Sequence, residues 1–538
     1  MEVLLSYKFE KKDIVIISIF AILLVIGISI YRDYGIHYDE KAQILIGSAS
    51  YKYIMQGDQD LLNFSDRYYG PFFEVPLLFL SNQVPATEMI YLRHLAVFLT
   101  FFVGSIVFYF LARRLFNNSW WALLATILLV ISPRIFADSF YNSKDIPFMI
   151  FFMIGAGSLM KVLGMLCSRQ SGIKLWGMAI LHAFFCAVTI ATRLPGIILV
   201  GLSIGLIVVA TLIYHENLKR NTIILVCYLV CTVGLTVFFW PILWHDPIGE
   251  FNKSFLRMSR YPWSGSMLYQ GEIIPARNTV WHYLPVWISI STPYLQLGAF
   301  VMGGICLIKV LLKRLSIQFK ETLKSWRDSI TPDSLDWMVV SGWLVIPFIA
   351  IYVFQSILYD AWRQMFFIYP AIVLIGVYGL KTCYEWLIRV FRKRTFGVIL
   401  FGIIISLGIL EPAVFMVQNH PFENVYFNAL SGDPATLRQR YEMDYWGLSY
   451  KQGIDYILTH DSRDKIKIFT TIPIELYVEY MLPKSQGSRF VFVEPNDAEY
   501  FLSTYRWHPN DYPYSDKVFS IKVRGTEIMT VYRLNKAE

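Results

Sequence analysis

Long apolar stretches recur along the whole chain, and they limit the fold more than any other feature of the sequence. A helix needs about 20 consecutive apolar residues to cross the hydrocarbon core of a membrane. With 55% hydrophobic and only 16% charged residues among 538, the chain is predicted to be an α-helical polytopic membrane protein. About eleven stretches qualify, at 13–30, 94–111, 118–133, 145–166, 175–192, 195–214, 221–240, 284–312, 337–358, 364–380 and 396–417.

Lysine and arginine gather in every second loop between these stretches, for example at Arg113–Arg114, Lys219–Arg220 and Arg392–Arg394. Cytoplasmic loops of membrane proteins carry such an excess of basic residues. We therefore expect a cytoplasmic N-terminus and, with an odd number of spans, an external C-terminus. The formal net charge of +8 comes mostly from these loops, and no binding of nucleic acid is expected.

The composition becomes polar after residue 417, which divides the chain into a membrane domain, 1–417, and an external domain, 418–538. Ser449 is placed to cap a helix at the start of this second part. Alternating β-branched and aromatic residues predict strands, so we expect a small external α/β domain. The expected helices are 450–459 and about 474–481, and the expected strands are 465–470, 490–493, 518–523 and 528–532.

Two of the external loops contain more than simple turns. The first, about 31–93, holds two apolar segments, Ala42–Met55 and Tyr69–Leu80, that are too short to span a membrane. They are either helices that lie in the membrane interface or plain amphipathic loop helices. The second loop, about 241–283, is rich in aromatic residues that either anchor to lipid headgroups or contact a sugar or lipid.

Carboxylates occur where two apolar stretches meet the expected outer surface. Asp39 and Glu40 follow the first stretch by about ten residues, and Asp145 begins the fourth. An exposed carboxylate is often only a solvated charge. A general base, however, must come within hydrogen-bond reach of the group that it deprotonates, and a carboxylate at this position can reach an acceptor while the substrate stays in lipid.

Basic residues occur near the same surface, against the general bias toward the cytoplasm. Arg134 and Lys144 lie in Ser132–Pro147, which is expected to be a loop, while Arg193 and Arg363 lie at the ends of other stretches. Such arginines either extend to the interface and pair with a neighbour, as Arg363 could with Asp360, or they hold a phosphate. The six cysteines show no spacing typical of metal ligands, and no metal site is predicted.

Together these motifs resemble those of the GT-C glycosyltransferases that use a polyprenyl-phosphate sugar, among them the protein O-mannosyltransferases and the aminoarabinose transferases of lipid A. The similar features are Asp39-Glu40, the helices of the first loop, Asn142–Asp145, Pro285–Pro293 and Arg363–Pro370. The resemblance implies a GT-C membrane domain that transfers a sugar with inversion at the external face. It implies no nucleotide donor and no required metal, although the use of a divalent metal ion stays open.

The resemblance also implies roles for single residues. Asp39 corresponds to the base that activates the acceptor, Asp145 helps to orient the acceptor or base, and Glu40 completes the catalytic set. The sequence departs from the aminoarabinose transferases at Ala42, where they have arginine, and at Tyr69–Pro71, where they have Lys-Pro-Pro. The donor phosphate must then fall to other cations, and the candidates are Lys41, Arg67, Arg134, Lys144, Arg193 and Arg363.

Two segments of the last 120 residues, Asn419–Asn428 and Asp444–Ser449, resemble the tails of bacterial members of this group. They favour a bacterial inner membrane but name no acceptor, which could be a protein, a lipid or a glycan. The alternative functions are a transporter or flippase of lipid-linked sugars and, less favoured, a receptor-like protein. A transporter predicts ionisable groups inside its spans, whereas here they cluster at one face.

Overall fold

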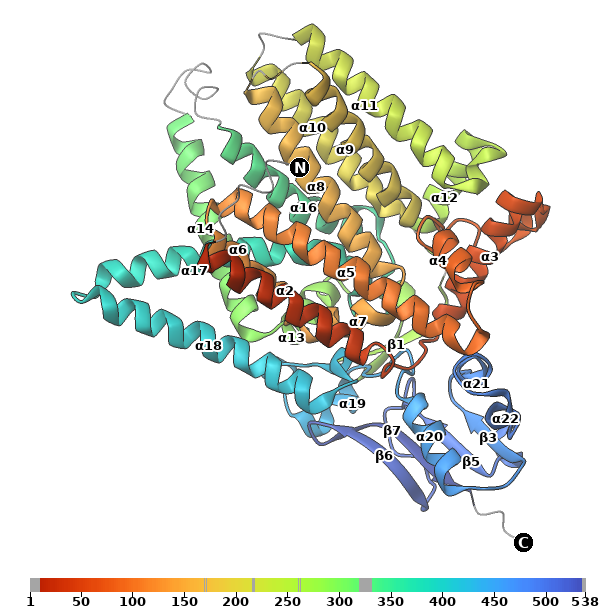
Figure 1. Cartoon of the computed structure of the whole chain (residues 1–538). Helices are drawn as coiled ribbons and strands as arrows, with labels where there is room; N and C mark the ends of the chain where they lie inside the picture. Colours follow the sequence, from red (N-terminus) through yellow and green to blue (C-terminus); the bar gives the residue numbers. More distant parts are fainter. Residues whose placement is uncertain are drawn as a thin grey trace.

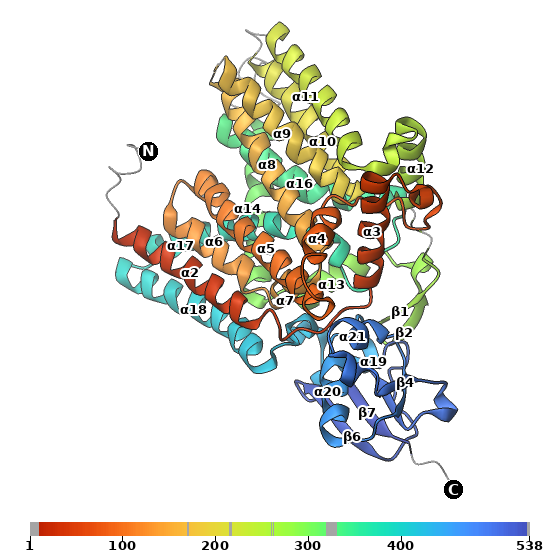
Figure 2. The same cartoon turned by 45° about the vertical axis from the view of Figure 1, so that its right-hand side comes forward.

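The structure is a computed structural model that describes residues 10–168, 170, 172–214, 218–259, 261, 263–318 and 331–534. Long helices form a bundle, and the C-terminal segment forms a separate small domain against one end of it (Figure 1). The N-terminal helix, α2, lies along the side of this bundle in both views (Figure 2).

Ten of the described helices are long and apolar enough to cross a membrane, and the number rises to eleven if one bent pair counts as a span. The prediction of about eleven spans is therefore confirmed. The helices that form these ten candidate spans are α2 (Lys11–Ile30), α5 (Ala86–Phe116), α8 (Asp145–Cys167), α9 (Ile173–Thr192), α10 (Ile197–Ile213), α11 (Leu218–Phe239), α14 (Tyr294–Gln318), α16 (Pro332–Phe354), α17 (Tyr369–Val390) and α18 (Arg394–Asn419).

Two predicted spans are broken in the structure. The stretch 118–133 ends early as α6 (Ser119–Val130), and the chain turns by 69° into α7 (Pro133–Tyr141). Most of Ser132–Pro147 is thus a buried helix, and its prediction as a loop was wrong. Proline starts a helix well because its missing N–H has no partner there in any case, and Pro133 takes this position. The stretch 284–312 likewise divides, before Pro293, into α13 (Tyr283–Ser291) and α14.

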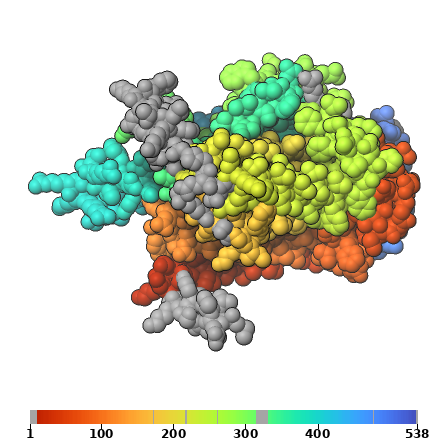
Figure 3. Space-filling model, turned by 90° about the horizontal axis from the view of Figure 1, so that it is seen from above, coloured from red at the N-terminus to blue at the C-terminus, as the bar shows by residue number. Residues whose placement is uncertain are grey.

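The bundle has two uneven parts. Helices α8, α9, α10, α11 and α16 stand side by side, while α17 and α18 form a long hairpin that projects from the rest (Figures 1 and 3). Where the two parts meet, Trp343 of α16 donates a hydrogen bond of 2.7 Å from Nε1 to the carbonyl oxygen of Phe367. Phe367 lies in the helical turn η6 (Arg363–Ile368), which leads into α17. The start of α17 is therefore fixed against α16.

The first long loop forms the two short helices expected from its apolar segments. They are α3 (Glu40–Gln56) and α4 (Glu74–Ser81), joined through the turn η1 (Gln59–Asn63). The second helix begins at Glu74, so residues 69–73 of the predicted segment are not helical. A Cβ atom on Gly47 would lie 3.1 Å from Cβ of Glu74, and the two helices can pack closely because glycine has no side chain there.

The aromatic loop before α13 folds into short elements of its own. They are η4 (Pro241–Trp244), α12 (Pro247–Ser259), the antiparallel hairpin of β1 (Ser266–Tyr269) and β2 (Glu272–Pro275), and η5 (Ala276–Asn278). No sequence pattern predicts this hairpin. It contacts the C-terminal part of the chain through a β-bridge between Tyr269 and Tyr441 and through a hydrogen bond of 2.7 Å from Trp507 Nε1 to the carbonyl oxygen of Ser266.

The C-terminal domain is a mixed five-stranded sheet in the order β4-β3-β5-β7-β6. Its β3 pairs in parallel with β4 and β5, and β7 pairs antiparallel with β5 and β6. The predicted α/β domain and its four predicted strands are confirmed. The strands are β3 (Ile466–Thr470), β4 (Phe490–Phe492), β5 (Tyr500–Ser503), β6 (Lys517–Val523) and β7 (Thr526–Arg533), and the helices are α20 (Tyr450–His460), α21 (Glu475–Tyr480) and α22 (Lys484–Gly487).

Two details of this domain differ from expectation. Strand β5 was missed because its four residues are all buried and show no alternation of polar and apolar side chains. The side chain of Ser449 does not cap α20. Its hydroxyl donates instead to the Asp444 carboxylate at 2.5 Å. Short helical turns follow α18, at η7 (Glu423–Val425), η8 (Ala429–Ser431), η9 (Pro434–Thr436) and α19 (Leu437–Arg440), and another, η10 (Pro495–Asp497), lies between β4 and β5.

Candidate active site

Charged residues from four distant segments meet at the end of the bundle that faces the C-terminal domain. Asp39 lies just before α3, Lys144 and Asp145 lie at the start of α8, Arg193 follows the end of α9, and Arg363 begins η6. Each of the four ion pairs among these residues involves a buried side chain. The structure thus brings together five of the nine residues that the sequence singled out.

Asp145 is the most enclosed member of the group, with 1% of its side chain exposed. Its Oδ1 pairs with Arg193, and its Oδ2 lies 3.3 Å from Nη1 of Arg363. The amide of Asn142 donates a hydrogen bond of 3.1 Å to the same Oδ2. A buried carboxylate is stable only when it is paired and hydrogen-bonded, and these partners hold Asp145 in one orientation.

Asp39 is held less tightly and is the more accessible carboxylate, with 24% of its side chain exposed. Lys144 Nζ lies 3.4 Å and Arg363 Nη2 lies 3.2 Å from its Oδ2. Among the described residues, both of these contacts go to Oδ2, and Oδ1 is left for a group from outside. Burial acts to raise the pKa of Asp39, but the charges of Lys144 and Arg363 outweigh it and hold the pKa well below its usual range.

Arg363 links the two carboxylates. Besides Asp39 and Asp145 it contacts Asp360, whose Oδ2 lies 3.0 Å from its Nη2. The rings of Tyr359 and Trp446 lie 5.2 and 4.6 Å from its guanidinium carbon. Only 1% of the side chain is exposed. A guanidinium presents several donors in a fixed plane, so Arg363 can set the separation of Asp39 and Asp145.

Lys144 is a buried member of this group. Its ammonium nitrogen lies 5.4 Å from the ring centre of Tyr69, in addition to its contact with Asp39. Burial lowers the pKa of Lys144 to about 8, although Asp39 acts in the opposite direction. The charge of this lysine therefore changes close to physiological pH.

Glu40 points away from these residues although it follows Asp39 directly. Its carboxylate is buried and lies 3.4 Å from Nε of Arg93 and 3.6 Å from Nε2 of His94. Burial raises the pKa of Glu40, but the neighbouring His94 and Arg93 bring it down to about 2. Arg93 also pairs with Glu74 at 2.7 Å. Glu40 is thus part of a buried ion network that fastens α3 and α4 to α5.

Three of the predicted phosphate ligands lie outside the cluster. Lys41 is exposed on α3. Arg67 donates to the Phe64 carbonyl and the Tyr68 hydroxyl at 2.9 Å each. Arg134 is buried in α7, where its Nε donates to the carbonyl oxygen of Tyr426 at 3.0 Å. Lys144, Arg193 and Arg363 are the candidates that the structure places beside Asp39 and Asp145.

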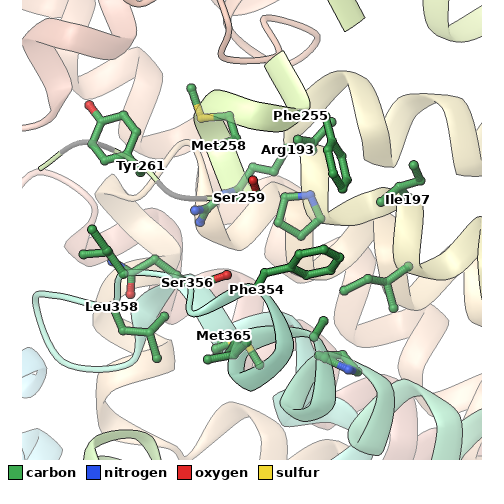
Figure 4. Close-up of a pocket in the computed structure, with 18 of the residues that line it drawn as sticks. Arg193, Ile197, Phe255, Met258, Ser259, Tyr261, Phe354, Ser356, Leu358 and Met365 are labelled. Carbon is green, nitrogen blue, oxygen red and sulfur yellow. The ribbon is translucent and has the colours of Figure 1, made fainter. Parts of the chain in front are cut away.

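An apolar pocket opens next to Arg193 and encloses about 1100 Å³ with its open mouth included. Phe255 and Met258 of α12 form one wall, and Phe354 and Met365 lie opposite (Figure 4). The pocket continues between α10 and α16. Its lining combines the cation Arg193 with many apolar side chains, which suits an amphipathic ligand. Its aliphatic lining includes Ile197, Ile198, Pro347, Ala350 and Ile351.

Some residues around this site have no recognisable signal in the sequence. The sequence suggests Asp360 only as a partner of Arg363. It carries no signal for Arg506, whose Nη2 lies 2.7 Å from Oδ1 of Asp360, because this contact joins distant segments. The sequence does contain a signal for the buried ion pair of Arg93 and Glu74. Arg93 lies within an apolar helix, where a charge is costly unless it is paired. In the described part of the chain, no group of three or more His, Cys, Asp or Glu residues is arranged to hold a metal ion.

Comparison with known proteins agrees with the resemblance inferred from the sequence. Residues 59–244 match the model of the dolichyl-phosphate-mannose-protein mannosyltransferase family. A comparison with curated proteins gives no match.

Two solved structures illustrate the structural likeness. ArnT from Cupriavidus metallidurans, bound to undecaprenyl phosphate, aligns with 96% of this chain and 97% of its own at 13% identity and a TM-score of 0.47. The archaeal oligosaccharyltransferase AglB from Archaeoglobus fulgidus, in complex with an inhibitory peptide and a dolichol-phosphate, aligns with 91% of this chain and 69% of its own at 10% identity and a TM-score of 0.47. The family match confirms the predicted resemblance over residues 59–244, which are similar to the dolichyl-phosphate-mannose-protein mannosyltransferases.

Proposed function

We propose that the chain is a glycosyltransferase of the GT-C type. It would transfer a sugar from a polyprenyl-phosphate donor to an acceptor with inversion, and Asp39 would be the base. The observation that carries this proposal is Asp39, a partly exposed carboxylate whose ion pairs with the described cations Lys144 and Arg363 both go to Oδ2. It lies near the apolar pocket lined by Arg193. The pocket would take the first isoprene units of the donor. Lys144, Arg193 and Arg363 would hold its phosphate, as cations do for leaving phosphates in other transferases.

The transfer needs only the donor, the acceptor and these side chains. The acceptor, a hydroxyl or amine, attacks the anomeric carbon from the side opposite the phosphate. The carbon–oxygen bond to the phosphate breaks, and polyprenyl phosphate leaves with the electron pair. The acceptor proton passes to Oδ1 of Asp39. One displacement of this kind inverts the anomeric configuration.

Asp39 is a weak base while Lys144 and Arg363 hold its pKa low. A donor phosphate would draw both cations toward itself, and the pKa of Asp39 would then rise. Binding of the donor would in this way activate the base. Asp145 takes no proton in this scheme, because its pairs with Arg193 and Arg363 serve to place the cations that face the phosphate.

The experiment that tests the reaction is incubation of the purified protein with a panel of polyprenyl-phosphate sugars and hydroxyl or amine acceptors. Mass spectrometry would follow free polyprenyl phosphate, and NMR would give the configuration of the product. We expect free polyprenyl phosphate and an inverted product with at least one donor. A retained configuration contradicts a single displacement. Reconstituted protein that moves the donor across vesicles without cleaving it favours the transporter or flippase.

We also propose that the site and the C-terminal domain face the outside of a bacterial inner membrane, with the N-terminus in the cytoplasm. The basic residues Arg113, Lys219 and Arg392 support this orientation, because they lie at loops joining the opposite ends of the spans. Ser462 is exposed on the C-terminal domain. In intact cells, Ser462→Cys should react with a membrane-impermeant maleimide more than the parent protein does. Labelling that appears only after the cells are permeabilised contradicts the orientation.

A further inference from the structure

A tight turn in the C-terminal domain presents Trp446 to the site. Within Asp444–Ser449, the Asp444 carboxylate accepts hydrogen bonds from the backbone N–H groups of Leu448 at 3.1 Å and Ser449 at 2.8 Å. Gly447 has φ of 75°, a conformation that glycine adopts without strain. The turn is therefore fixed by its own residues, and nothing in the proposed reaction accounts for it.

Trp446 contacts the segment that precedes Asp39 and also the side chain of Arg363. Its ring stacks on His37 with centroids 4.5 Å apart, and it lies 4.6 Å from the Arg363 guanidinium. Its carbonyl oxygen accepts the N–H of Tyr38, the residue before Asp39, at 3.1 Å. A Cβ atom on Gly35 would lie 2.3 Å from the carbonyl oxygen of Leu448. The turn and the segment that carries Asp39 are thus packed backbone to backbone.

Arg506 adds a second link from the same domain. It lies in the segment after β5, and its Nη2 is 2.7 Å from Oδ1 of Asp360. Its Nη1 donates to the carbonyl oxygen of Tyr445 in the turn. The other oxygen of Asp360 contacts Arg363 at 3.0 Å. Asp360 is therefore held between an arginine of the C-terminal domain and the arginine that joins Asp39 to Asp145.

The backbone at Asp360 is one that needs such support. Asp360 and Ala361 have φ of 54° and 60°, in the left-handed region that residues other than glycine rarely adopt. Two consecutive residues in this region persist only where the surroundings fix them. The ion pairs on both sides of the Asp360 carboxylate supply that constraint.

We propose that Arg506 is a positioning residue of the transferase site, acting through Asp360 to place Arg363 between Asp39 and Asp145. The C-terminal domain is then part of the catalytic unit. This inference rests on the proposed function. Without Arg506, Asp360 would have Arg363 as its remaining partner in this chain of contacts, and it would draw Arg363 away from Asp39.

A second ion pair between the same two domains provides a matched control. Arg524, in the turn between β6 and β7, lies 2.9 Å from Glu411 of α18 and donates to the carbonyl oxygen of Phe427. Like Arg506 it joins a carboxylate and a backbone carbonyl, but no further ion pair leads from Glu411 to Asp39 in the described residues. Arg524→Gln removes such a link without touching the site.

The test is a double-mutant cycle on the full-length protein, with Arg506→Gln, Asp360→Asn, the double variant and Arg524→Gln. We expect Arg506→Gln to lower kcat/KM for sugar transfer about 10-fold or more, because small displacements of catalytic groups have effects of this size. Adding it to Asp360→Asn should change the rate less than about 2-fold, since residues acting through one contact are not additive. Arg506→Lys, which keeps the charge, should recover part of the rate and replaces the glutamine variant if that does not fold.

Hydrogen–deuterium exchange provides a readout that does not depend on sugar transfer. Peptides covering 355–362 should exchange faster in Arg506→Gln than in the parent protein or Arg524→Gln. Effects that add in the cycle, a rate loss equal to that of Arg524→Gln, or unchanged exchange in 355–362 would each overturn the inference. If the parent protein transfers no sugar, the proposed function fails, and the exchange result alone decides whether Arg506 fixes this loop.

Discussion

Arg363 Nη2 lies 3.2 Å from Oδ2 of Asp39, while Nη1 of the same guanidinium lies 3.3 Å from Oδ2 of Asp145. One side chain thus bridges the accessible carboxylate and the buried one. The bridge fixes which oxygen of Asp39 is occupied, because Lys144 and Arg363 both contact Oδ2.

The first prediction concerns Lys144, whose pKa is lowered to about 8 by burial. Its positive charge is present below this pH and is lost as the pH rises through it. If Lys144 binds the donor phosphate, kcat/KM should fall on the alkaline side with a midpoint near pH 8. Lys144→Arg keeps its charge over this range, so this limb of the profile should disappear. An unchanged limb in the arginine variant would show that another group titrates.

The second prediction concerns the apolar pocket, which we expect to hold the lipid part of the donor. Ala350 lines it on α16. Ala350→Trp should raise KM about 10-fold for a donor with a long polyprenyl chain, a change equivalent to about 1.4 kcal/mol of binding. KM for a donor with one or two isoprene units should change much less. Equal effects on both donors would argue that the lipid binds elsewhere.

The sequence predicts the position of the site residues better than their ion pairs, because the paired residues are far apart in the chain. The alternation of spans was enough to expect Asp39, Asp145, Arg193 and Arg363 at one surface, and the structure places them together. Their pairing was not predictable, since it depends on helix rotation and on the bend before Pro133. Lys41 shows the limit of reasoning from proximity: on a helix, neighbours are turned about 100° from each other, so closeness to Asp39 in sequence did not place it in the site.

The same contrast between local patterns and distant contacts holds for the fold. Apolar stretches and alternating β-rich runs predicted the spans and four strands of the C-terminal domain, because each pattern is local. The contact of Arg506 with Asp360 spans 146 residues and leaves no pattern in either segment. The role of the C-terminal domain at the site could therefore only come from the structure.

The third prediction concerns Glu442, which is buried between the C-terminal domain and the membrane domain. Burial raises its pKa to about 8, with Arg506 acting in the opposite direction. From its ordinary value of 4.5 up to 8, the folded state keeps a proton that the unfolded state has lost. Stability therefore falls as the pH rises through this range. Glu442→Gln removes this dependence.

Thermal unfolding in detergent at pH 5 and pH 8 checks this expectation. The difference in stability between the two values should shrink by about 1 kcal/mol or more in Glu442→Gln, since one pKa unit corresponds to about 1.4 kcal/mol. Glu494 is exposed in the same domain, and Glu494→Gln is the control. Equal pH dependence in the two variants would refute a raised pKa at Glu442.

The fourth prediction concerns the opposite end of the bundle. Arg114 of α5 donates two hydrogen bonds to Asp336 of α16, at 2.7 and 3.2 Å. Asp336→Asn should destabilise the protein by about 1 kcal/mol, because it removes the counter-ion of Arg114, whose side chain is still 33% exposed to solvent. The folded fraction should keep its kcat, since this pair lies far along the spans from Asp39. A loss of kcat in folded protein would show coupling between the two ends.

The measurement that tests the account most directly compares the parent protein with Asp39→Asn and Asp33→Asn in the release of polyprenyl phosphate. Asp33 lies in the same loop and pairs with His420 at 2.9 Å, and it is about half exposed, so it controls for loss of a loop carboxylate. The account predicts that Asp39→Asn lowers the rate at least about 100-fold, while Asp33→Asn stays within a few-fold of the parent and both variants remain folded. Near-normal release by Asp39→Asn would contradict its role as the base.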